Sequence, residues 1–371
     1  MTQWLCSQIG AREHYAVPRA LHQLGRLGRL YTDFWADALV RKIKISRLRS
    51  LASRFHSDLA GAPVKSWNFR SLLWEAGLRR RARSGGLHGT YFGFIEVGQK
   101  FARAVRDDLR RRSISPTETL FYAYDTSALE SLEWLRERDI PCVLNQMDPN
   151  RTEVELVRAE EKRWPGWAVG AIEVPEEYFC RREREWQLAD RVVVNSEFCR
   201  QGLIQQGVPP EKLVVIPLCY ETDTAEPAAE VRPGPSRLRP LKLLFLGQVI
   251  LRKGIQYLME AAKLMLNEPV HFDIVGPIGI SDEALKSAPA NLTFHGRATR
   301  DQIGKWYRQS DVFVLPTLSD GFAVTQIEAM AHGLPVITTP NCGDVVADGI
   351  DGFIVPARQA EIFVKTIYRY L

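Results

Sequence analysis

The sequence predicts two α/β domains, each built on a parallel, doubly wound sheet. The chain has 371 residues, which is too long for one ordinary hydrophobic core and suits two domains of comparable size. Short apolar segments alternate with segments of helical periodicity through much of the chain, as a parallel sheet requires. A stretch rich in proline and polar residues, Ala228 to Pro240, interrupts this alternation and is typical of an interdomain linker.

The alternation is clearest after this stretch. The expected strands are short apolar runs, several of which end at a glycine: Leu241–Leu246, His271–Val275, Leu292–Phe294, Asp311–Leu315, Pro335–Thr338 and Phe353–Val355. The expected helices carry apolar residues at helical spacing: Gly254–Leu266, Thr299–Gln309 and Val324–Ala331.

The first half shows a weaker form of the same pattern. Its expected strands are Thr119–Tyr124, Cys142–Asn145, Arg191–Asn195 and Leu213–Ile216, with helices at Ser127–Arg138 and Glu197–Gln206. Residues 36–115 are rich in arginine and favour helix, but do not follow the alternation. We therefore expect an N-terminal Rossmann-like domain over residues 1–220 with a basic helical region at 36–115, a linker at 221–240, and a C-terminal domain over 241–371.

Composition excludes several classes of protein. With 45% hydrophobic and 25% charged residues, the chain is typical of a soluble globular protein. No segment approaches the roughly 18 apolar residues that span a bilayer, and the N-terminus lacks the pattern of a signal peptide. The six cysteines form no C-x-x-C pair and the seven histidines do not cluster. We therefore expect a cytoplasmic protein with reduced thiols and no metal site.

The charge is distributed unevenly. Residues 1–120 contain 22 Lys and Arg against 9 Asp and Glu, whereas the remaining residues contain 27 against 35. Between Arg41 and Arg54 there are six basic residues and no acidic one. If this segment is helical, its apolar stripe and cationic face suit either an anionic membrane surface or packing on the N-terminal core with solvated arginines. No motif that combines aromatic and basic residues supports binding to nucleic acid.

The residues from Asp311 to Pro356 have the features of a ligand site. An apolar strand leads into a loop with Asp320 and Gly321, after which a helix begins. In a doubly wound sheet, ligands bind at the carboxyl ends of the strands. Glycine allows the backbone to approach a ligand closely, and a helix N-terminus favours an anion. Glu328 lies on this helix, where its carboxylate can accept both hydroxyls of a ribose.

A second stretch, Leu244 to Gly254, follows the same logic. A strand ends at Gly247, a loop containing Gln248 and Arg252 follows, and Lys253 stands at the start of the next helix. A lysine there can reach the phosphates of a nucleotide. The next strand also ends at a glycine, Gly276, which we include in the nucleotide site.

Together these stretches resemble family 4 of the retaining glycosyltransferases. The resemblance is close over residues 241–356 and looser over residues 1–220, where the segment from Gly10 to His14 resembles the first glycine-rich loop of the family and the segment from Val192 to Ser196 its VxxxS strand. It rests on these features: Gly247, Lys253-Gly254, the Asp311 strand, Asp320-Gly321-Phe322-Ala323, Glu328-Ala329-Met330-Ala331, Gly333-x-Pro335-Val336 and Asp348-Gly349…Gly352.

The resemblance implies a GT-B fold, in which two Rossmann-like domains face each other across a cleft. It implies that the C-terminal domain binds a nucleotide-diphosphate sugar and that the N-terminal domain binds a glycan, lipid-linked or small-molecule acceptor. Transfer would proceed with retention and without a metal or other cofactor. Glu328 would bind the ribose and Lys253 the diphosphate, Asp320 and the backbone of Gly321, Phe322 and Ala323 would hold the donor sugar, and Gly10 would approach the reaction centre.

The sequence departs from the family pattern at three points. Asp320 stands where most members have glutamate, and Gln248 where many have arginine, which leaves Lys253, helped by Arg252, as the cation for the diphosphate. The usual histidine after an N-terminal-domain strand is absent, and Asp148 is the substitute we consider. Instead of a catalytic role, Asp148 could have a structural one, in which it forms a turn with Pro149.

Several alternatives remain open on the sequence. Glu328 and Lys253 could be surface residues, and Asp320 could only cap the helix. The fold also occurs in sugar-nucleotide epimerases and phosphorylases, whose further catalytic residues are not evident here, and in non-catalytic sugar-nucleotide-binding subunits. We also expect that the chain lacks the C-terminal helix that returns to the N-terminal domain in similar proteins.

Overall fold

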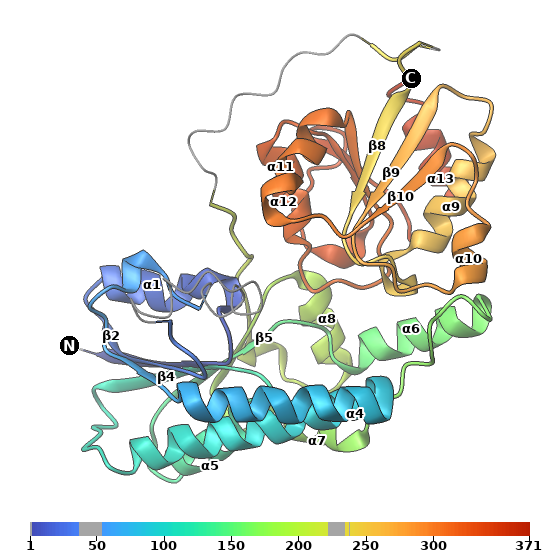
Figure 1. Cartoon of the computed structure of the whole chain (residues 1–371). Helices are drawn as coiled ribbons and strands as arrows, with labels where there is room; N and C mark the ends of the chain where they lie inside the picture. The colour runs from blue at the N-terminus through green and yellow to red at the C-terminus, as the bar shows by residue number, and fades with distance from the viewer. Residues whose placement is uncertain (1, 37–53, 222–233, 237) are drawn as a thin grey trace. The chain divides into compact units, whose positions relative to one another are not determined.

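The computed structural model describes residues 2–36, 54–221, 234–236 and 238–371, which form two compact units (Figure 1). Unit 1 contains the residues up to Met147 together with Glu173–Val194 and Gly207–Val214. Unit 2 contains Asp148–Ile172, Asn195–Gln206 and Val215–Leu371. Most of the basic segment between Arg41 and Arg54 and much of the expected linker lie outside the described residues.

Unit 1 contains a seven-stranded sheet in the order β3-β2-β1-β4-β5-β6-β7. Its strands are β1 (Gln3–Gln8), β2 (Leu27–Thr32), β3 (Val64–Ser66), β4 (Thr119–Tyr124), β5 (Cys142–Gln146), β6 (Arg191–Val194) and β7 (Leu213–Val215). The last four confirm the predicted strands. The first three were not predicted, because polar residues such as Gln8 and Thr32 are buried within them and break the apolar pattern.

Helices cover both faces of this sheet (Figure 1). Helix α1 (Ala16–Gln23) lies on one face. On the other face α4 (Asn68–Leu109), α5 (Leu129–Arg136) and α7 (Glu176–Leu188) pack against one another. The helical character expected for residues 36–115 is thus confirmed over α4.

Helix α4 is a hairpin of two arms, residues 68–85 and 87–109, that meet at Gly86, where the backbone leaves the helical region at φ 55° and ψ −137°. Arg81 on the first arm forms a 2.6 Å ion pair with Glu96 on the second. A Cβ atom at Gly89 would stand 2.3 Å from the carbonyl oxygen of Arg81, so glycine allows the two arms to pack closely.

Unit 2 contains a six-stranded parallel sheet in the order β10-β9-β8-β11-β12-β13. Its strands agree with the predicted ones to within two residues at each end: β8 (Leu241–Leu246), β9 (Val270–Val275), β10 (Leu292–Gly296), β11 (Val312–Leu315), β12 (Val336–Thr338) and β13 (Gly352–Ile354). They lie in a continuous hydrophobic core, as expected for a parallel sheet buried on both faces.

The helices of unit 2 also cover both faces of its sheet (Figure 1). Helices α9 (Ile255–Leu264) and α13 (Ala360–Ile367) pack together on one face, with the short α10 (Asp282–Lys286) nearby. On the other face lie α11 (Arg300–Gln309) and α12 (Val324–Ala331). The doubly wound arrangement predicted for this half is therefore confirmed.

Two helices that precede the linker belong to unit 2, namely α6 (Arg151–Arg163) and α8 (Glu197–Gln205). On α6 the buried carboxylate of Glu160 accepts hydrogen bonds from Gln256 at 3.0 Å and from the Tyr257 hydroxyl at 2.7 Å. Arg358 completes its partners at 2.5 Å. These polar contacts help to attach α6 to the rest of unit 2, together with the buried Val154 and Val157.

Candidate functional site

The strand order of unit 2 reverses between β8 and β11, and the loops after these strands meet at that point. The β8–α9 loop contains the 3-10 turn Leu251–Lys253 and ends at Gly254, whose φ is +76°. A Cβ atom at Gly254 would stand 1.9 Å from the carbonyl oxygen of Pro316, just after β11. Likewise a Cβ atom at Gly276 would stand 1.7 Å from the carbonyl oxygen of Gly247. Glycine is therefore required for these loops to touch, at the position where open α/β sheets bind ligands.

This loop contact brings Lys253 and Asp320 together. The Lys253 ammonium forms an ion pair with the Asp320 carboxylate, and both side chains are largely buried. The backbone N–H of Asp320 donates to the carbonyl oxygen of Asn341 at 2.8 Å, which fixes the loop behind the carboxylate. Lys253 and Asp320, which were both selected from the sequence as candidate site residues, are 67 positions apart in the chain and lie in one site.

Arg252 lies in a second cluster that the sequence did not reveal. Its Nη1 atom is 3.1 Å from the carboxylate of Glu153 on α6 and donates to the carbonyl oxygen of Ser319 at 3.0 Å. The Ser319 hydroxyl donates to the same Glu153 oxygen at 3.0 Å. Glu153 could not be found from a motif, because it acquires its role only when α6 packs on unit 2.

The two members of this cluster shift each other's protonation. Burial raises the pKa of Glu153, and the nearby carboxylates of Asp148 and Asp320 raise it further, against the lowering effect of Arg252. Burial lowers the pKa of Arg252, but the same three carboxylates outweigh it and leave that pKa above its ordinary value. With three carboxylates and the two cations Arg252 and Lys253, the cluster has one more acidic group than basic groups.

The turn Gly321–Ala323 is held from two sides. The Ser196 hydroxyl, at the start of α8, donates to the Gly321 carbonyl oxygen at 2.6 Å. The Ala323 N–H donates to the Cys342 carbonyl oxygen at 2.9 Å. Within the described residues, the N–H groups of Gly321 and Phe322 have no backbone acceptor. Together with the first turn of α12, whose N–H groups have no acceptor within the helix, they can bind an anion.

Glu328 lies on α12, two turns after this segment. One of its carboxylate oxygens accepts a 2.8 Å hydrogen bond from the Tyr307 hydroxyl. Burial, followed by repulsion from Glu328, raises the pKa of Tyr307, so this hydroxyl remains a donor. Its ring stacks on His332 with 4.8 Å between ring centroids. Within the described part of the chain Glu328 Oε1 has no donor, so it can accept hydrogen bonds from a ligand.

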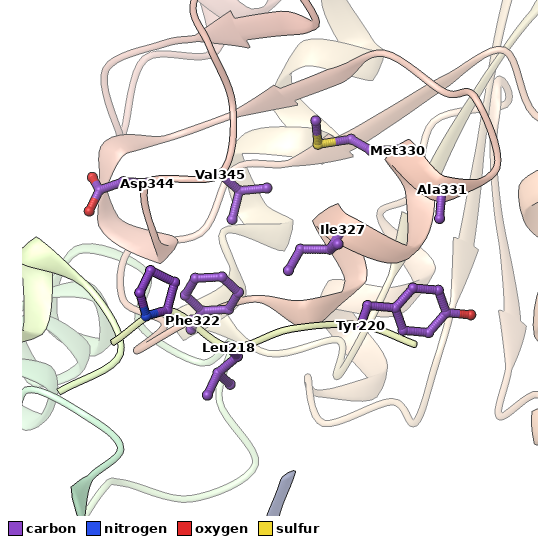
Figure 2. Close-up of a pocket in the computed structure, with 9 residues that line it drawn as sticks. Leu218, Tyr220, Phe322, Ile327, Met330, Ala331, Asp344 and Val345 are labelled. Carbon is purple, nitrogen blue, oxygen red and sulfur yellow. The ribbon is translucent and has the colours of Figure 1, made fainter. Parts of the chain in front are cut away.

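A pocket of about 420 Å³ lies beside the turn Gly321–Ala323. Figure 2 shows the residues that line it. Its wall consists mainly of apolar side chains from residues 217–220, the turn, α12 and the 344–345 segment: Pro217, Leu218, Tyr220, Phe322, Ile327, Met330, Ala331, Asp344 and Val345. Phe322 packs against Gly343, where a Cβ atom would meet its ring at 2.8 Å. The ring of Phe322 therefore supports the turn, whereas the sequence assigned this residue only a backbone role.

The remaining selected residues lie elsewhere. Gln248 is exposed in the β8–α9 loop. Asp148 accepts a 2.8 Å hydrogen bond from the Asn150 N–H, as a turn former does, and its charge also reaches the Glu153–Arg252 cluster. Gly10 belongs to unit 1, where its N–H donates to Asp33 at 2.8 Å.

The loop that follows Gly10 has an unusual backbone. Glu13, His14 and Tyr15 all have positive φ angles, between 48° and 61°, which are uncommon for residues other than glycine. The Tyr124 hydroxyl donates to Glu13 at 3.0 Å, and burial raises the pKa of Glu13. Strained backbone of this kind clusters at functional sites, so this loop is a candidate contact for a ligand of unit 1.

Unit 1 also contains a buried carboxylate outside any motif. Glu185 on α7 accepts hydrogen bonds from the N–H groups of Thr126, Ala128 and Leu129, at 2.6, 2.9 and 3.0 Å. Burial raises the pKa of Glu185 to about 7.

Among the described residues of both units, no group of three or more potential ligands could hold a metal ion. None of the described helices is long and apolar enough to cross a membrane.

These two doubly wound units and their loop sites define a GT-B fold. The structure of Alr3699/HepE from Anabaena in complex with UDP aligns with a TM-score of 0.60 and 15% sequence identity, covering 99% of this chain and 89% of that chain. The sucrose-phosphate synthase of Thermosynechococcus elongatus aligns with a TM-score of 0.59 and 17% identity, covering 99% of this chain and 89% of that one. The predicted fold class is confirmed.

The sequence comparisons show which proteins this chain is similar to. Residues 240–371 match the family model described as Glycosyl transferases group 1. Over 207 residues the chain is 29% identical to a D-inositol 3-phosphate glycosyltransferase of Streptomyces bingchenggensis, which covers 49% of this chain and 45% of that protein. Over 190 residues it is 24% identical to the amylovoran biosynthesis glycosyltransferase AmsK of Erwinia amylovora, which covers 47% and 46%. The chain spans about half the length of these curated relatives.

Proposed function

We propose that this protein is a retaining glycosyltransferase of family 4 that moves a hexose from a nucleoside-diphosphate sugar to a glycan, lipid-linked or small-molecule acceptor. Unit 2 binds the donor, and the strained loop after Gly10 in unit 1 contacts the acceptor side. The glycosyltransferase relatives, one of them named for amylovoran biosynthesis, support this activity, and a role in polysaccharide assembly in the cytoplasm is part of the proposal.

The observation that carries this proposal is the arrangement at the β8/β11 switch point. Lys253 and Arg252 supply two cations from the loop after β8, and the Gly321–Ala323 turn supplies N–H groups from the loop after β11. Within the described residues, Glu328 presents a carboxylate oxygen without a donor, just over one turn along α12. Cations and N–H groups suit a diphosphate, and a carboxylate suits the two hydroxyls of a ribose.

In the proposed mechanism the cations act on the leaving group. Breaking the anomeric C–O bond develops negative charge on the diphosphate, and fixed positive groups stabilise this charge without rearranging. Before the donor binds, these cations are paired with Asp320 and Glu153. The diphosphate therefore replaces these two carboxylates as the partner of the cations, and Asp320 becomes available to accept a hydrogen bond from a hydroxyl of the donor sugar.

Retention follows if the leaving diphosphate accepts the proton of the acceptor on the face it has just left. Lys253, Arg252 and the N–H groups stabilise the charge that develops on it, and in this proposal the reaction uses no metal ion and no other cofactor. Gln248 is exposed and supplies no charge, which makes Arg252 the second cation in place of the arginine that many family members have there.

A thermal-shift screen of UDP-, GDP- and ADP-sugars tests donor binding, because a ligand of the native state stabilises it by mass action. Turnover is then measured as release of the nucleoside diphosphate. An epimerase would convert one nucleotide sugar into another without net release of the nucleoside diphosphate. A non-catalytic binding subunit would be stabilised by the nucleotide sugar but would not convert it. Either result would contradict the proposal, as would the absence of a shift with every nucleotide sugar.

A further inference from the structure

The first arm of the α4 hairpin presents apolar side chains to solvent. Phe69, Leu72 and Leu73 are 75%, 44% and 60% exposed, and Ala76 is exposed as well. These positions are spaced i, i+3, i+4 and i+7, so they form one stripe along the helix, which we call the outer stripe. Leu87, just past the turn at Gly86, is also 47% exposed.

The opposite face of the same arm is the one that packs. Ser71 is buried and donates to Asp33 at 3.3 Å, and Leu78 contacts Gly93 on the second arm. Figure 1 shows the two arms side by side along unit 1. The outer stripe is therefore not the core face of this helix, and an exposed apolar stripe is unusual for a surface that faces only water.

Positive charge surrounds the outer stripe. Residues 68–85 contain five arginines and one acidic residue, Glu75. Arg79 pairs with Glu75 and Arg81 with Glu96, both at 2.6 Å. Arg70, Arg80 and Arg83 have no ion pair within the described residues, and all three are exposed.

We propose that this arm of α4 is a docking surface for an anionic lipid membrane, on which it lies with the outer stripe inserted at the interface and its arginines at the phosphate groups. An apolar stripe beside an arginine-rich face suits this environment, because the side chains enter the acyl boundary while the guanidinium groups remain with the headgroups. A second copy of the chain fits less well, since facing arms would oppose like charges.

The docking surface is independent of the proposed transfer reaction, and its test involves no donor. The full-length chain is sedimented with vesicles of phosphatidylcholine alone or with about 30% phosphatidylglycerol, at low and high salt. We expect binding only to the anionic vesicles at low salt. Leu72→Ser/Leu73→Ser should reduce the partition coefficient on the order of tenfold through lost apolar burial. Arg80→Gln/Arg83→Gln should reduce it on the order of tenfold or more.

Matched controls come from exposed residues of unit 2. Leu264→Ser/Leu266→Ser removes two leucines that are 56% and 50% exposed, and Lys305→Gln/Arg308→Gln removes two exposed cations of α11. Both control variants should bind as the wild type does, and circular dichroism should show that all four variants are folded.

Three results would overturn the proposal. The first is that the wild type does not bind anionic vesicles. The second is that it binds but the α4 variants bind equally, which would assign membrane contact to other residues. The third is that light scattering reveals a dimer that Leu72→Ser/Leu73→Ser dissociates while vesicle binding is absent or unchanged. Release of nucleoside diphosphate from the donor can persist in each case, so failure here leaves the proposed reaction to its own test.

Discussion

Replacing Glu153 by glutamine removes one negative charge from the cluster around Arg252 and keeps nearly the same shape. The glutamine oxygen can still accept from the Ser319 hydroxyl or from Arg252, which lie 3.0 and 3.1 Å from the carboxylate. The cluster changes from three carboxylates and two cations to two of each. The change therefore separates two roles of Glu153, which are to attach α6 to unit 2 and to compete with the donor for Arg252.

The two effects differ in size. Hydrogen bonds to a charged group contribute roughly 1.5–3 kcal/mol, and relief from burying a carboxylate offsets this loss. Because the pKa of Glu153 is raised, the folded state favours its neutral form, so we expect Glu153→Gln to change the melting temperature of unit 2 by no more than about 4 °C. For the diphosphate, charges about 6 Å apart repel by about 3 kcal/mol at an effective dielectric constant near 20. After loss of some ordering of Arg252, we expect the nucleoside diphosphate to bind about tenfold more tightly, or about 1.4 kcal/mol.

Calorimetric titration with the nucleoside diphosphate that gives the largest thermal shift measures this change. Because the pKa of Glu153 is raised, the folded protein gains a proton there earlier than an ordinary glutamate as the pH falls, and the affinity of the wild type should then approach that of Glu153→Gln. The variant itself should lack this part of the pH dependence. Glu155→Gln is the matched control, since Glu155 lies on α6 two residues away and is exposed.

A folded Glu153→Gln protein that binds the diphosphate more weakly than the wild type would refute this reasoning. It would mean that Glu153 serves mainly to orient Arg252 and that competition between the two anions is negligible. Equal affinities for Glu153→Gln, Glu155→Gln and the wild type would instead place the diphosphate away from Arg252.

Three further predictions concern the reaction and the stability of unit 1. Lys253→Ala and Glu328→Ala should each lower turnover on the order of a hundredfold, as loss of one preorganised charge contact does. The control variants Lys263→Ala and Glu361→Gln, on exposed surfaces, should leave turnover unchanged. Near-normal rates in both site variants would show that Lys253 and Glu328 do not belong to the donor site. Release of nucleoside diphosphate should persist in excess chelator, and loss that manganese or magnesium restores would show a metal requirement. With the pKa of Glu185 at about 7 instead of 4.5, the folded state binds this proton more tightly than the unfolded chain does. The stability that the bound proton gives to the folded state is therefore full below pH ~4.5 and is lost as the pH rises through ~7. The melting temperature of the wild type should therefore fall between pH 5 and 8 by more than that of Glu185→Gln, and parallel curves would contradict the raised pKa.

The sequence alone was enough to predict the second sheet and the loops that form its candidate site. Strands of a parallel sheet are buried on both faces, so each of them is a short apolar run, and β8 begins and ends at the predicted residues. Gly254 and Gly276 could be selected from the sequence, and in the structure close approach of two backbones leaves glycine as the residue that fits at both positions.

The sequence did not predict the strands at the start of unit 1. In β1 and β2 the polar residues Gln8 and Thr32 are buried at the strand ends, where they donate hydrogen bonds to Gly10 and Asp33, close by in the chain. A pattern of apolar residues cannot distinguish such strands from loops. The hairpin of α4 was also not predicted, although its turn at Gly86 falls on the pair Gly85-Gly86, a dipeptide that marks turns.

The tertiary structure also determined which residues share the candidate site. Lys253 and Asp320 each belong to a local motif, so both could be selected from the sequence, but only the fold shows that they form an ion pair. Glu153 and Tyr307 belong to no motif, and their contacts with Arg252 and Glu328 exist because α6 and α11 pack on unit 2. Local periodicity reflects burial and backbone geometry, which are properties of a short segment. The partner of a buried charge depends on contacts between segments distant in the chain, and only the folded structure determines these contacts.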